Sequence, residues 1–138
     1  MYSFPHPQAI FDGGGTLFTK IGSGNFIANT GVRLIDYTLS SNYVLHLQSI
    51  YVLANLGGTG GYFDFTGEIR TAGDALVGRF YRKRLLYNEP LINTQDVLPL
   101  NLLIPGGYRV VISIYNATNT TIYAEAHLIG ILYEVFRA

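Results

Sequence analysis

The 138-residue sequence contains no cysteine and no tryptophan, and it has a single methionine. The absence of cysteine excludes disulfide frameworks, thiolate metal sites and cysteine nucleophiles. Charged residues are also scarce, at 13% of the chain against roughly 25% in ordinary soluble domains. Nine basic and nine acidic residues give a formal net charge of zero, so no overall field attracts nucleic acid or an anionic membrane.

The sequence also lacks long apolar runs. No stretch approaches the roughly 18 consecutive apolar residues that a membrane-spanning helix needs, so we expect no membrane span. The start, MYSFPHPQAIFDGGG, has neither a basic opening nor an apolar run, so we expect no signal peptide. Because 49% of the residues are hydrophobic, few polar groups remain to cover the exterior. We therefore expect part of the surface to be buried against other chains.

Short apolar or alternating segments, separated by turn residues, fill most of the chain. The expected strands lie near 16–21, 25–29, 31–39, 43–55, 62–70, 75–81, 97–104, 108–115 and 121–136. The expected turns are GSGN at 22–25, SSN at 40–42, GGTGG at 57–61, PGG at 105–107 and NATNT at 116–120. A weak helical turn near 71–78 is the only helix expected.

About nine short strands with tight turns predict an all-β fold, an antiparallel β-sandwich, and among sandwiches we favour a jelly roll. We expect one sandwich domain over residues 16–138. Residues 1–15 contain two prolines and end in three glycines, and they predict an extended, irregular N-terminal arm.

The last expected strand has an unusual pattern. Over 121–128, apolar residues alternate with Tyr123, Glu125 and His127, as in a half-buried strand. Beyond Leu128 the strand becomes apolar on both faces. Such a strand lies inside a sandwich or faces another subunit. Because strands near a chain end are often peripheral, we favour contact with another subunit.

One stretch resembles a catalytic motif. Residues 10–18, IFDGGGTLF, are similar to the opening of haloacid-dehalogenase-type phosphatases, which carry Asp-x-Asp after a buried parallel strand. Here the second aspartate, the acid–base residue, is replaced by Gly14. The crossover helices that a parallel sheet needs are not expected either. We therefore interpret Asp12 as a turn residue.

Other catalytic, cofactor and metal patterns are missing from the sequence. The GGTGG segment at 57–61 is not followed by the Lys-Ser/Thr of a nucleotide loop. Three histidines, His6, His46 and His127, lie on separate segments without ligand spacing. No Gly-x-Ser-x-Gly elbow is present. We predict no catalytic residue, no cofactor and no metal, and hence no enzyme.

Two further patterns have plain structural explanations. Asp64 and Glu68 share a strand face, as a glycosidase pair would, but so short a chain builds a deep cleft with difficulty. The segments Asn116-Ala-Thr and Asn119-Thr-Thr match the glycosylation sequon. We interpret them as hairpin-turn residues that tolerate unusual backbone angles.

The basic residues cluster at one place, where Arg79, Arg82, Lys83 and Arg84 alternate with aromatic residues. Such a run is a solvated turn, or a strand edge protected from pairing by its charge, and it offers a docking patch for an acidic partner surface. Binding of nucleic acid is disfavoured because the rest of the chain is neutral.

The C-terminal third carries a resemblance to a known class of proteins. The run VLPLNLLIPGGYRVVISIYNATNTTIYAEAHLIGILYEV resembles the end of small jelly-roll or sandwich proteins of bacteriophage virions. In those proteins a Pro-Gly turn leads into a strand that ends near an asparagine, and the closing strand carries a small-Gly-apolar patch, here at 126–130. The resemblance implies a structural protein located in the virion: a capsid decoration (cement) protein, a minor capsid subunit, or a spike or tail component, often trimeric.

We thus expect a homotrimer that also contacts other virion proteins, such as the major capsid protein. The interface candidates are Tyr2, Phe4, Ile129, Ile131, Tyr133, Val135 and Phe136. The alternative is a carbohydrate- or receptor-binding module of a tail or spike tip, in which exposed tyrosines would hold a glycan. The candidates for that role are Tyr43, Tyr51, Tyr62, Tyr81 and Tyr87.

Overall fold

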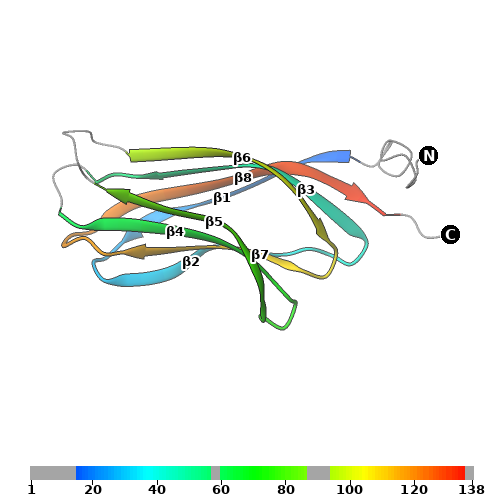
Figure 1. Ribbon diagram of the computed structural model, residues 1–138, viewed down its shortest axis with the longest axis horizontal. Coiled ribbons are helices and arrows are strands. Elements are labelled where there is room, and N and C mark those ends of the chain that lie inside the picture. Colours follow the sequence, from blue (N-terminus) through cyan, green and yellow to red (C-terminus); the bar gives the residue numbers. More distant parts are fainter. Residues whose placement is uncertain (1–14, 57–59, 87–93, 136–138) are drawn as a thin grey trace.

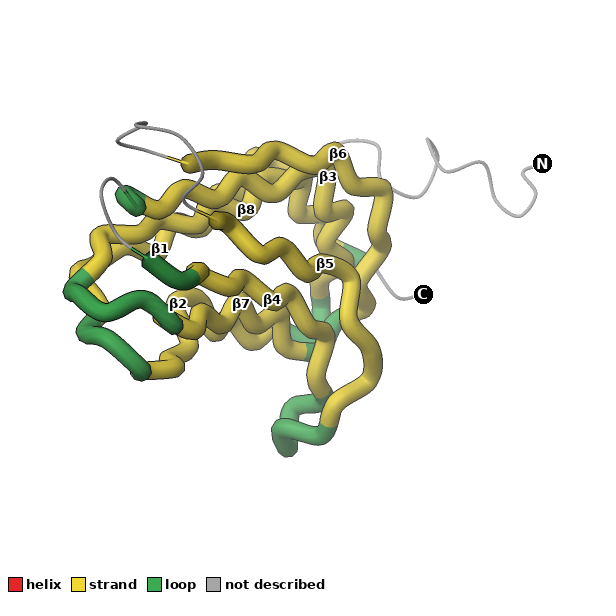
Figure 2. Tube along the Cα trace, turned by 60° about the vertical axis from the view of Figure 1, so that its left-hand side comes forward, coloured by secondary structure: helices red, strands yellow, loops and turns green. Residues whose placement is uncertain are grey.

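The computed structural model describes residues 15–56, 60–86 and 94–135, which form two four-stranded antiparallel sheets packed face to face (Figures 1 and 2). The strands are β1 (Gly15–Phe26), β2 (Thr30–Thr38), β3 (Tyr43–Ala54), β4 (Tyr62–Arg70), β5 (Leu76–Leu86), β6 (Thr94–Pro105), β7 (Arg109–Asn116) and β8 (Ile122–Glu134). The prediction of an all-β antiparallel sandwich is confirmed. The predicted arm over 1–15 lies, except for Gly15, outside the described residues.

The strand order identifies the sandwich as a jelly roll. Sheet A has the order β1-β8-β3-β6, and sheet B has the order β2-β7-β4-β5. The chain therefore pairs as a nested ribbon, β1 with β8, β2 with β7, β3 with β6 and β4 with β5, rolled into two layers. Only β4 and β5 form a hairpin of consecutive strands. The expected hairpin between 108–115 and 121–136 is wrong, because β7 and β8 belong to different sheets.

The GSGN segment at 22–25 is not a turn. It lies inside β1, which pairs with β8 without interruption from Gly15 to Phe26. A Cβ atom on Gly22 would lie 2.4 Å from the carbonyl oxygen of Leu34. Glycine is therefore present because the backbones approach closely, and not because the chain reverses. The expected strands 16–21 and 25–29 are one strand, which gives eight strands instead of nine.

The weak helical turn expected near 71–78 is the tight turn of the β4–β5 hairpin. The amide of Asp74 donates to the carbonyl of Thr71 (2.9 Å), and the amide of Thr71 donates to the carbonyl of Ala75 (2.8 Å). Asp74 has a φ of 77°, which aspartate tolerates better than most residues. The basic run that follows lies on β5, an edge strand of sheet B, so its interpretation as a charged strand edge is confirmed.

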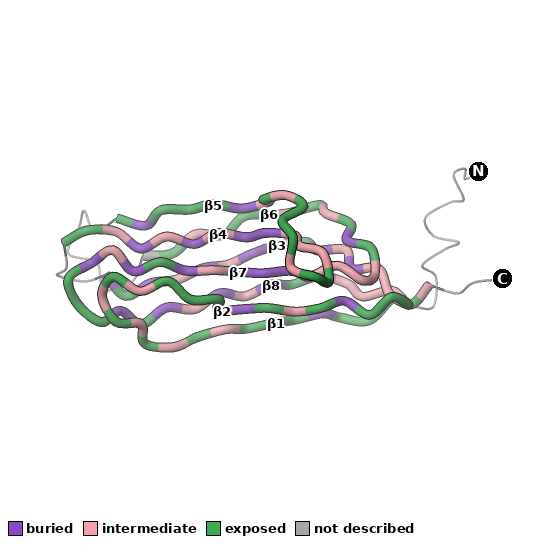
Figure 3. The backbone as a smooth tube through the Cα atoms, turned by 90° about the horizontal axis from the view of Figure 1, so that it is seen from below, coloured by how far each residue is buried: buried purple, intermediate pink, exposed green. Residues whose placement is uncertain are grey.

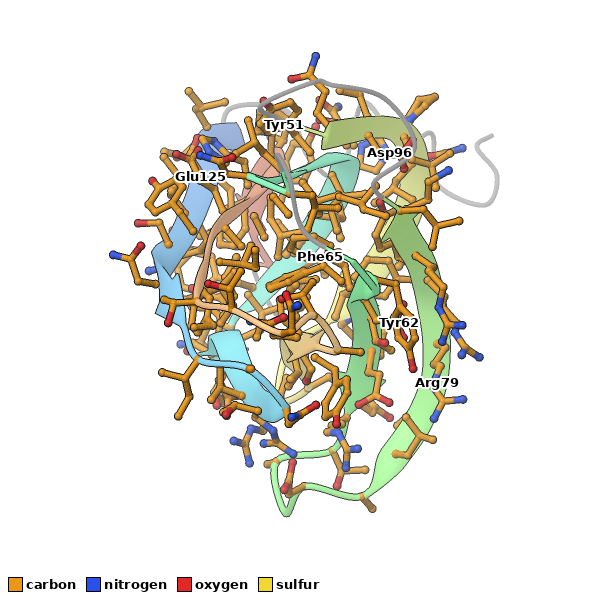
Figure 4. All side chains as sticks on the ribbon, turned by 90° about the vertical axis from the view of Figure 1, so that its left-hand side faces the viewer. Tyr51, Tyr62, Phe65, Arg79, Asp96 and Glu125 are labelled. Atoms are coloured by element: carbon orange, nitrogen blue, oxygen red, sulfur yellow. The ribbon has the colours of Figure 1, made fainter. Side chains whose placement is uncertain are left out.

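Buried and more exposed residues alternate along many of the strands (Figure 3), and the buried side chains form the core between the sheets. On β8 the alternation predicted over 121–128 is confirmed, since Ile122, Ala124, Ala126 and Leu128 are all buried. They meet the inward side chains of sheet B, and Figure 4 shows Phe65 of β4 between the two layers. The core is continuous and apolar, as close packing of two sheets requires.

The connection at 116–121 closes one end of the sandwich. Asn116 is fully buried, and its side-chain amide donates to the carbonyls of Phe26 (2.8 Å) and Thr120 (2.9 Å). Its side-chain oxygen accepts hydrogen bonds from the amide (2.9 Å) and hydroxyl (2.6 Å) of Thr118. Asn116 is thus a structural residue of a turn, as predicted. The turn joins the two sheets, and Asn116 stabilises it through hydrogen bonds and does not have a positive φ.

Candidate functional site

The two outer faces of the sandwich differ in chemistry. Figure 4 shows Tyr51 and Glu125 on the side of sheet A, and Arg79 on the side of sheet B. The outer face of sheet A is almost uncharged and carries many apolar side chains, whereas the outer face of sheet B is covered with ion pairs. Each of these two outer faces is a candidate functional surface.

All four strands of sheet A contribute apolar side chains to its outer face, with uncharged polar residues among them. Strand register aligns Leu17 of β1 with Ile131 of β8, then with His46 of β3 and Leu103 of β6. Further rows run parallel to this one: Thr19–Ile129–Ser49–Pro99, Ile21–His127–Tyr51–Val97 and Ser23–Glu125–Leu53–Gln95. Four of these apolar side chains are more than half exposed: Leu17, Ile21, Val97 and Leu103.

The one carboxylate of this face and several of its other polar groups are paired within it. Glu125 is the only carboxylate in these rows and lies between Tyr123 and His127, with His127 Nε2 2.8 Å from its Oε1. The hydrogen bond from Tyr123, followed by that from His127, holds the pKa of Glu125 below its ordinary value. Tyr51 donates its hydroxyl proton to Gln95 at 2.8 Å. A partner that covers this face would therefore bury no unpaired charge.

Three of the predicted interface residues, Ile129, Ile131 and Tyr133, lie on this face. Val135 follows the end of β8, and Tyr2, Phe4 and Phe136 lie outside the described residues. The reason given for the prediction was wrong, because β8 is an interior strand of sheet A, between β1 and β3. The exposed residues on β1 and β6 were missed, because strand register brings them next to β8 and sequence alone does not reveal it.

The outer face of sheet B carries paired arginines and carboxylates. Arg109 and Arg33 both bind Asp36, and the hydrogen bond from Arg109, then that from Arg33, lowers the pKa of Asp36. The next group is centred on Glu68, which accepts from Arg70 Nε at 2.9 Å and from Arg79 Nε at 3.2 Å. These pairs fix the side chains on this face of the sheet.

The four residues of the predicted docking patch do not share one surface. Arg79, Arg82 and Arg84 lie on the outer face of sheet B, opposite Glu68, Thr66 and Asp64 of β4. Lys83 faces the other way, with its Nζ 4.0 Å from a carboxylate oxygen of Asp96 on β6. Arg79 and Arg84 are held by carboxylates.

Arg82 differs from its neighbours, because it makes no ion pair with any described residue. It borders a surface pocket of about 390 Å³ between β4, β5 and β7. The pocket is lined by Asp64, Thr66, Glu68, Arg70, Arg79, Arg82, Ser113, Ile114 and Tyr115. Asp64 and Glu68 share this face, as expected, but arginines hold both carboxylates.

Two of the tyrosines considered for sugar binding are engaged within the sandwich. Tyr81 is buried, and desolvation, followed by a 2.7 Å hydrogen bond to Asp96, raises its pKa. The ring of Tyr62 is covered by Arg84, whose guanidinium carbon lies 3.7 Å from the ring centroid. Tyr87 lies outside the described residues. Tyr81 therefore offers no ring face to a glycan, and one face of the Tyr62 ring is already occupied.

Metal and membrane sites were also considered. Within the described ranges, no group of three histidine, aspartate or glutamate residues is placed to hold a metal ion. The same part of the chain has no helix long and apolar enough to cross a membrane. Asp12 and His6 lie outside the described residues.

No protein-family model matches the sequence, and no curated protein matches it. Solved structures of virus particles are similar in fold. A chain from the structure of infectious bursal disease virus Gx strain aligns over 93% of this chain with a TM-score of 0.53 and 12% identity. Chains from the VP2 subviral particle and the T13 viral particle of the same virus each align over 90%, with TM-scores of 0.51 and identities of 11% and 12%.

The chain spans 38%, 34% and 36% of those three viral chains, well under half of their length. Identities this low establish a common fold and nothing more specific. At that level, the resemblance to virion proteins with a jelly-roll or sandwich fold is confirmed.

Proposed function

We propose that this chain is a non-enzymatic structural subunit of a virus particle, and that it acts through subunit–subunit contacts made by the outer face of sheet A. The observation that carries the proposal is that exposed apolar side chains lie on the same, almost uncharged face of β1, β8, β3 and β6. The likeness of the fold to chains from virus particles supports it.

The size of the face suits a stable protein interface. Its strands are 12 or 13 residues long. Four strands about 4.8 Å apart, rising about 3.3 Å per residue, give roughly 19 Å by 40 Å, or about 750 Å². A standard interface buries about 800 Å² per partner. One face of sheet A therefore supplies nearly all the surface that one side of such an interface needs.

The chemistry of the face also suits burial. Exposed apolar side chains gain about 25 cal/mol per Å² when they leave water. The single carboxylate, Glu125, keeps its hydrogen bonds from Tyr123 and His127, so its desolvation is partly offset. The ion-paired face of sheet B has no comparable apolar area to bury, which makes sheet A the stronger candidate.

The sequence suggested a homotrimer that serves as a decoration or minor capsid subunit and contacts the major capsid protein. These details stay predictions. The likeness of fold supports a place in a particle, and the apolar face supports self-association. The number of copies is best determined by mass in solution.

The experiment is light scattering on the purified protein across a dilution series, with two single variants. Ile129→Lys places a charge near the centre of the proposed interface, where Ile129 is 38% exposed. We expect it to convert an oligomer into a folded monomer, because a buried unpaired charge costs several kcal/mol. Leu76→Lys is the matched control, since Leu76 is 49% exposed on β5, where it pairs with Arg70 of β4 in sheet B.

The control should keep the mass of the original oligomer. An oligomer that survives Ile129→Lys would contradict the assignment of this face. A protein that is monomeric at every concentration would contradict self-association itself. Circular dichroism of both variants checks that the sandwich remains folded.

A further inference from the structure

We propose that the pocket beside Arg82 on sheet B binds an acidic sugar, a saccharide residue that carries one carboxylate. The site lies on the face opposite the apolar surface of sheet A, so it stays accessible when subunits associate through sheet A. The inference is independent of the assembly function and rests on the side chains of β4, β5 and β7.

The first observation is that Arg82 has no ion-pair partner among the described residues. Arg84 donates twice to Asp64, at 2.9 and 3.0 Å, and Arg79 donates to Glu68 at 3.2 Å. Arg82 lies between them on the same face, opposite Thr66, without an ion pair to any described residue. Its guanidinium is free to hold a carboxylate through two parallel hydrogen bonds.

The second observation is the shape of the surface. Register places Ser113 of β7, Thr66 of β4 and Arg82 of β5 in one row. Two short side chains therefore form a floor, while the longer residues of the adjoining rows form the walls. Among the described residues the hydroxyls of Thr66 and Ser113 have no hydrogen-bond partner, so they are available to a ligand.

The third observation is the charge balance. Within the lining, Arg70 and Arg79 pair with Glu68, and Asp64 pairs with the neighbouring Arg84, which leaves the single charge of Arg82 without a carboxylate partner among the described residues. One carboxylate matches that charge better than the roughly double charge of a phosphate monoester. Each carboxylate oxygen of Asp64 and Glu68 already accepts one hydrogen bond from an arginine, and its second lone pair can accept another from a sugar hydroxyl.

The same features favour a sugar over a polymer backbone. A pocket of about 390 Å³ is in the range of small-ligand sites. Tyr115 at its wall is 42% exposed and offers an aromatic surface to the apolar side of a sugar ring.

The test is a titration followed by two-dimensional ¹H–¹⁵N NMR, with D-glucuronate and N-acetylneuraminate as probes and D-glucose as the neutral comparison. We expect saturable shifts of the Thr66 and Ser113 amides and of the Arg82 Nε resonance with an acidic sugar. Glucose should bind about ten-fold more weakly or not detectably, because it lacks the group that Arg82 holds.

Three variants make the test specific. Arg82→Gln should weaken binding about ten-fold or more. Lys83→Gln is its matched control, because it removes the same charge from the next residue, which faces the other way, and it should bind like the original protein. Thr66→Val removes one floor hydroxyl, keeps a β-branched side chain and should weaken binding several-fold.

Several outcomes would overturn the inference. These are absence of saturable binding, equal loss in the Arg82 and Lys83 variants, or tighter binding of inorganic phosphate than of the acidic sugars. Equal binding of free L-glutamate would overturn it in favour of an acidic peptide. Repeating the titration on Ile129→Lys separates this site from the proposed assembly, because a monomer should bind equally well.

Discussion

At the scale of single residues, Asn116 holds together three parts of the chain. Its four hydrogen bonds reach Phe26 at the end of β1 and both Thr118 and Thr120 in the β7–β8 connection. Because the side chain is fully buried, no water can replace these partners at the surface. The residue that sequence inspection flags as a sequon is a structural anchor at the end of the sandwich.

We predict that Asn116→Ala destabilises the protein by about 2–3 kcal/mol, since it leaves buried carbonyl and hydroxyl groups unpaired. Urea unfolding followed by circular dichroism measures the change. Asn119→Ala is the control: Asn119 belongs to the same connection but is exposed, and its substitution should alter stability by no more than about 0.5 kcal/mol. Equal effects of the two changes would argue against the buried network.

At the scale of elements, β1 depends on a close approach to β2. Gly22 lies where a Cβ atom would meet the carbonyl oxygen and side chain of Leu34 at 2.4 and 2.8 Å. The obstacle is partly backbone, so it yields only if one strand shifts. This contact explains why a glycine lies in the middle of a twelve-residue strand.

We predict that Gly22→Ala costs about 1–3 kcal/mol of stability through overpacking. The matched control is Gly78→Ala on β5, where a Cβ atom would meet nothing within 4 Å. That change should be neutral within about 0.5 kcal/mol. Parallel urea titrations compare the two, and a neutral Gly22→Ala would show that β2 moves aside freely.

Strand positions were readable from the sequence where alternation and turn chemistry agreed. Residues 121–128 alternate apolar and polar side chains and do form half of β8. The GSGN segment was misread because glycine serves both tight turns and close strand packing, and the sequence does not distinguish the two. Pairing was misread because short connections suggested hairpins, whereas nearly all of them cross between sheets.

The sequence alone indicated only part of the two candidate surfaces. Ile129 and Ile131 stood out because one strand was apolar on both faces. Leu17 and Leu103 did not, because they join that surface through pairings with residues far away in sequence. Arg82 appeared within a basic run, but its lack of an ion pair follows from strand register and not from composition.

At the scale of the whole molecule, the sandwich separates its chemistry between two faces. Charges concentrate on the outer face of sheet B, where most are paired, and the outer face of sheet A is left almost uncharged. A low overall charge therefore does not produce a uniformly apolar surface. It produces one face suited to burial and one suited to water.

We predict that self-association resists salt. Raising sodium chloride from 0.1 to 1 M shortens the screening length from about 10 to 3 Å, which weakens contacts between charges but not apolar burial. Light scattering should show an unchanged mass, and sodium sulfate should strengthen association. Dissociation at high salt would instead indicate an interface built on the ion pairs of sheet B.

The nested pairing of the strands has a consequence for how the protein forms. β1 begins at Gly15, yet its only partner within sheet A is β8, which ends at Glu134. During synthesis, β1 must therefore wait until β8 has been made before it can pair, with its apolar side chains uncovered in the meantime. Folding that depends on such distant contacts is slow, and an unpaired strand edge invites aggregation. The arrival of β8, and not the emergence of the first strands, is the event that permits sheet A to close.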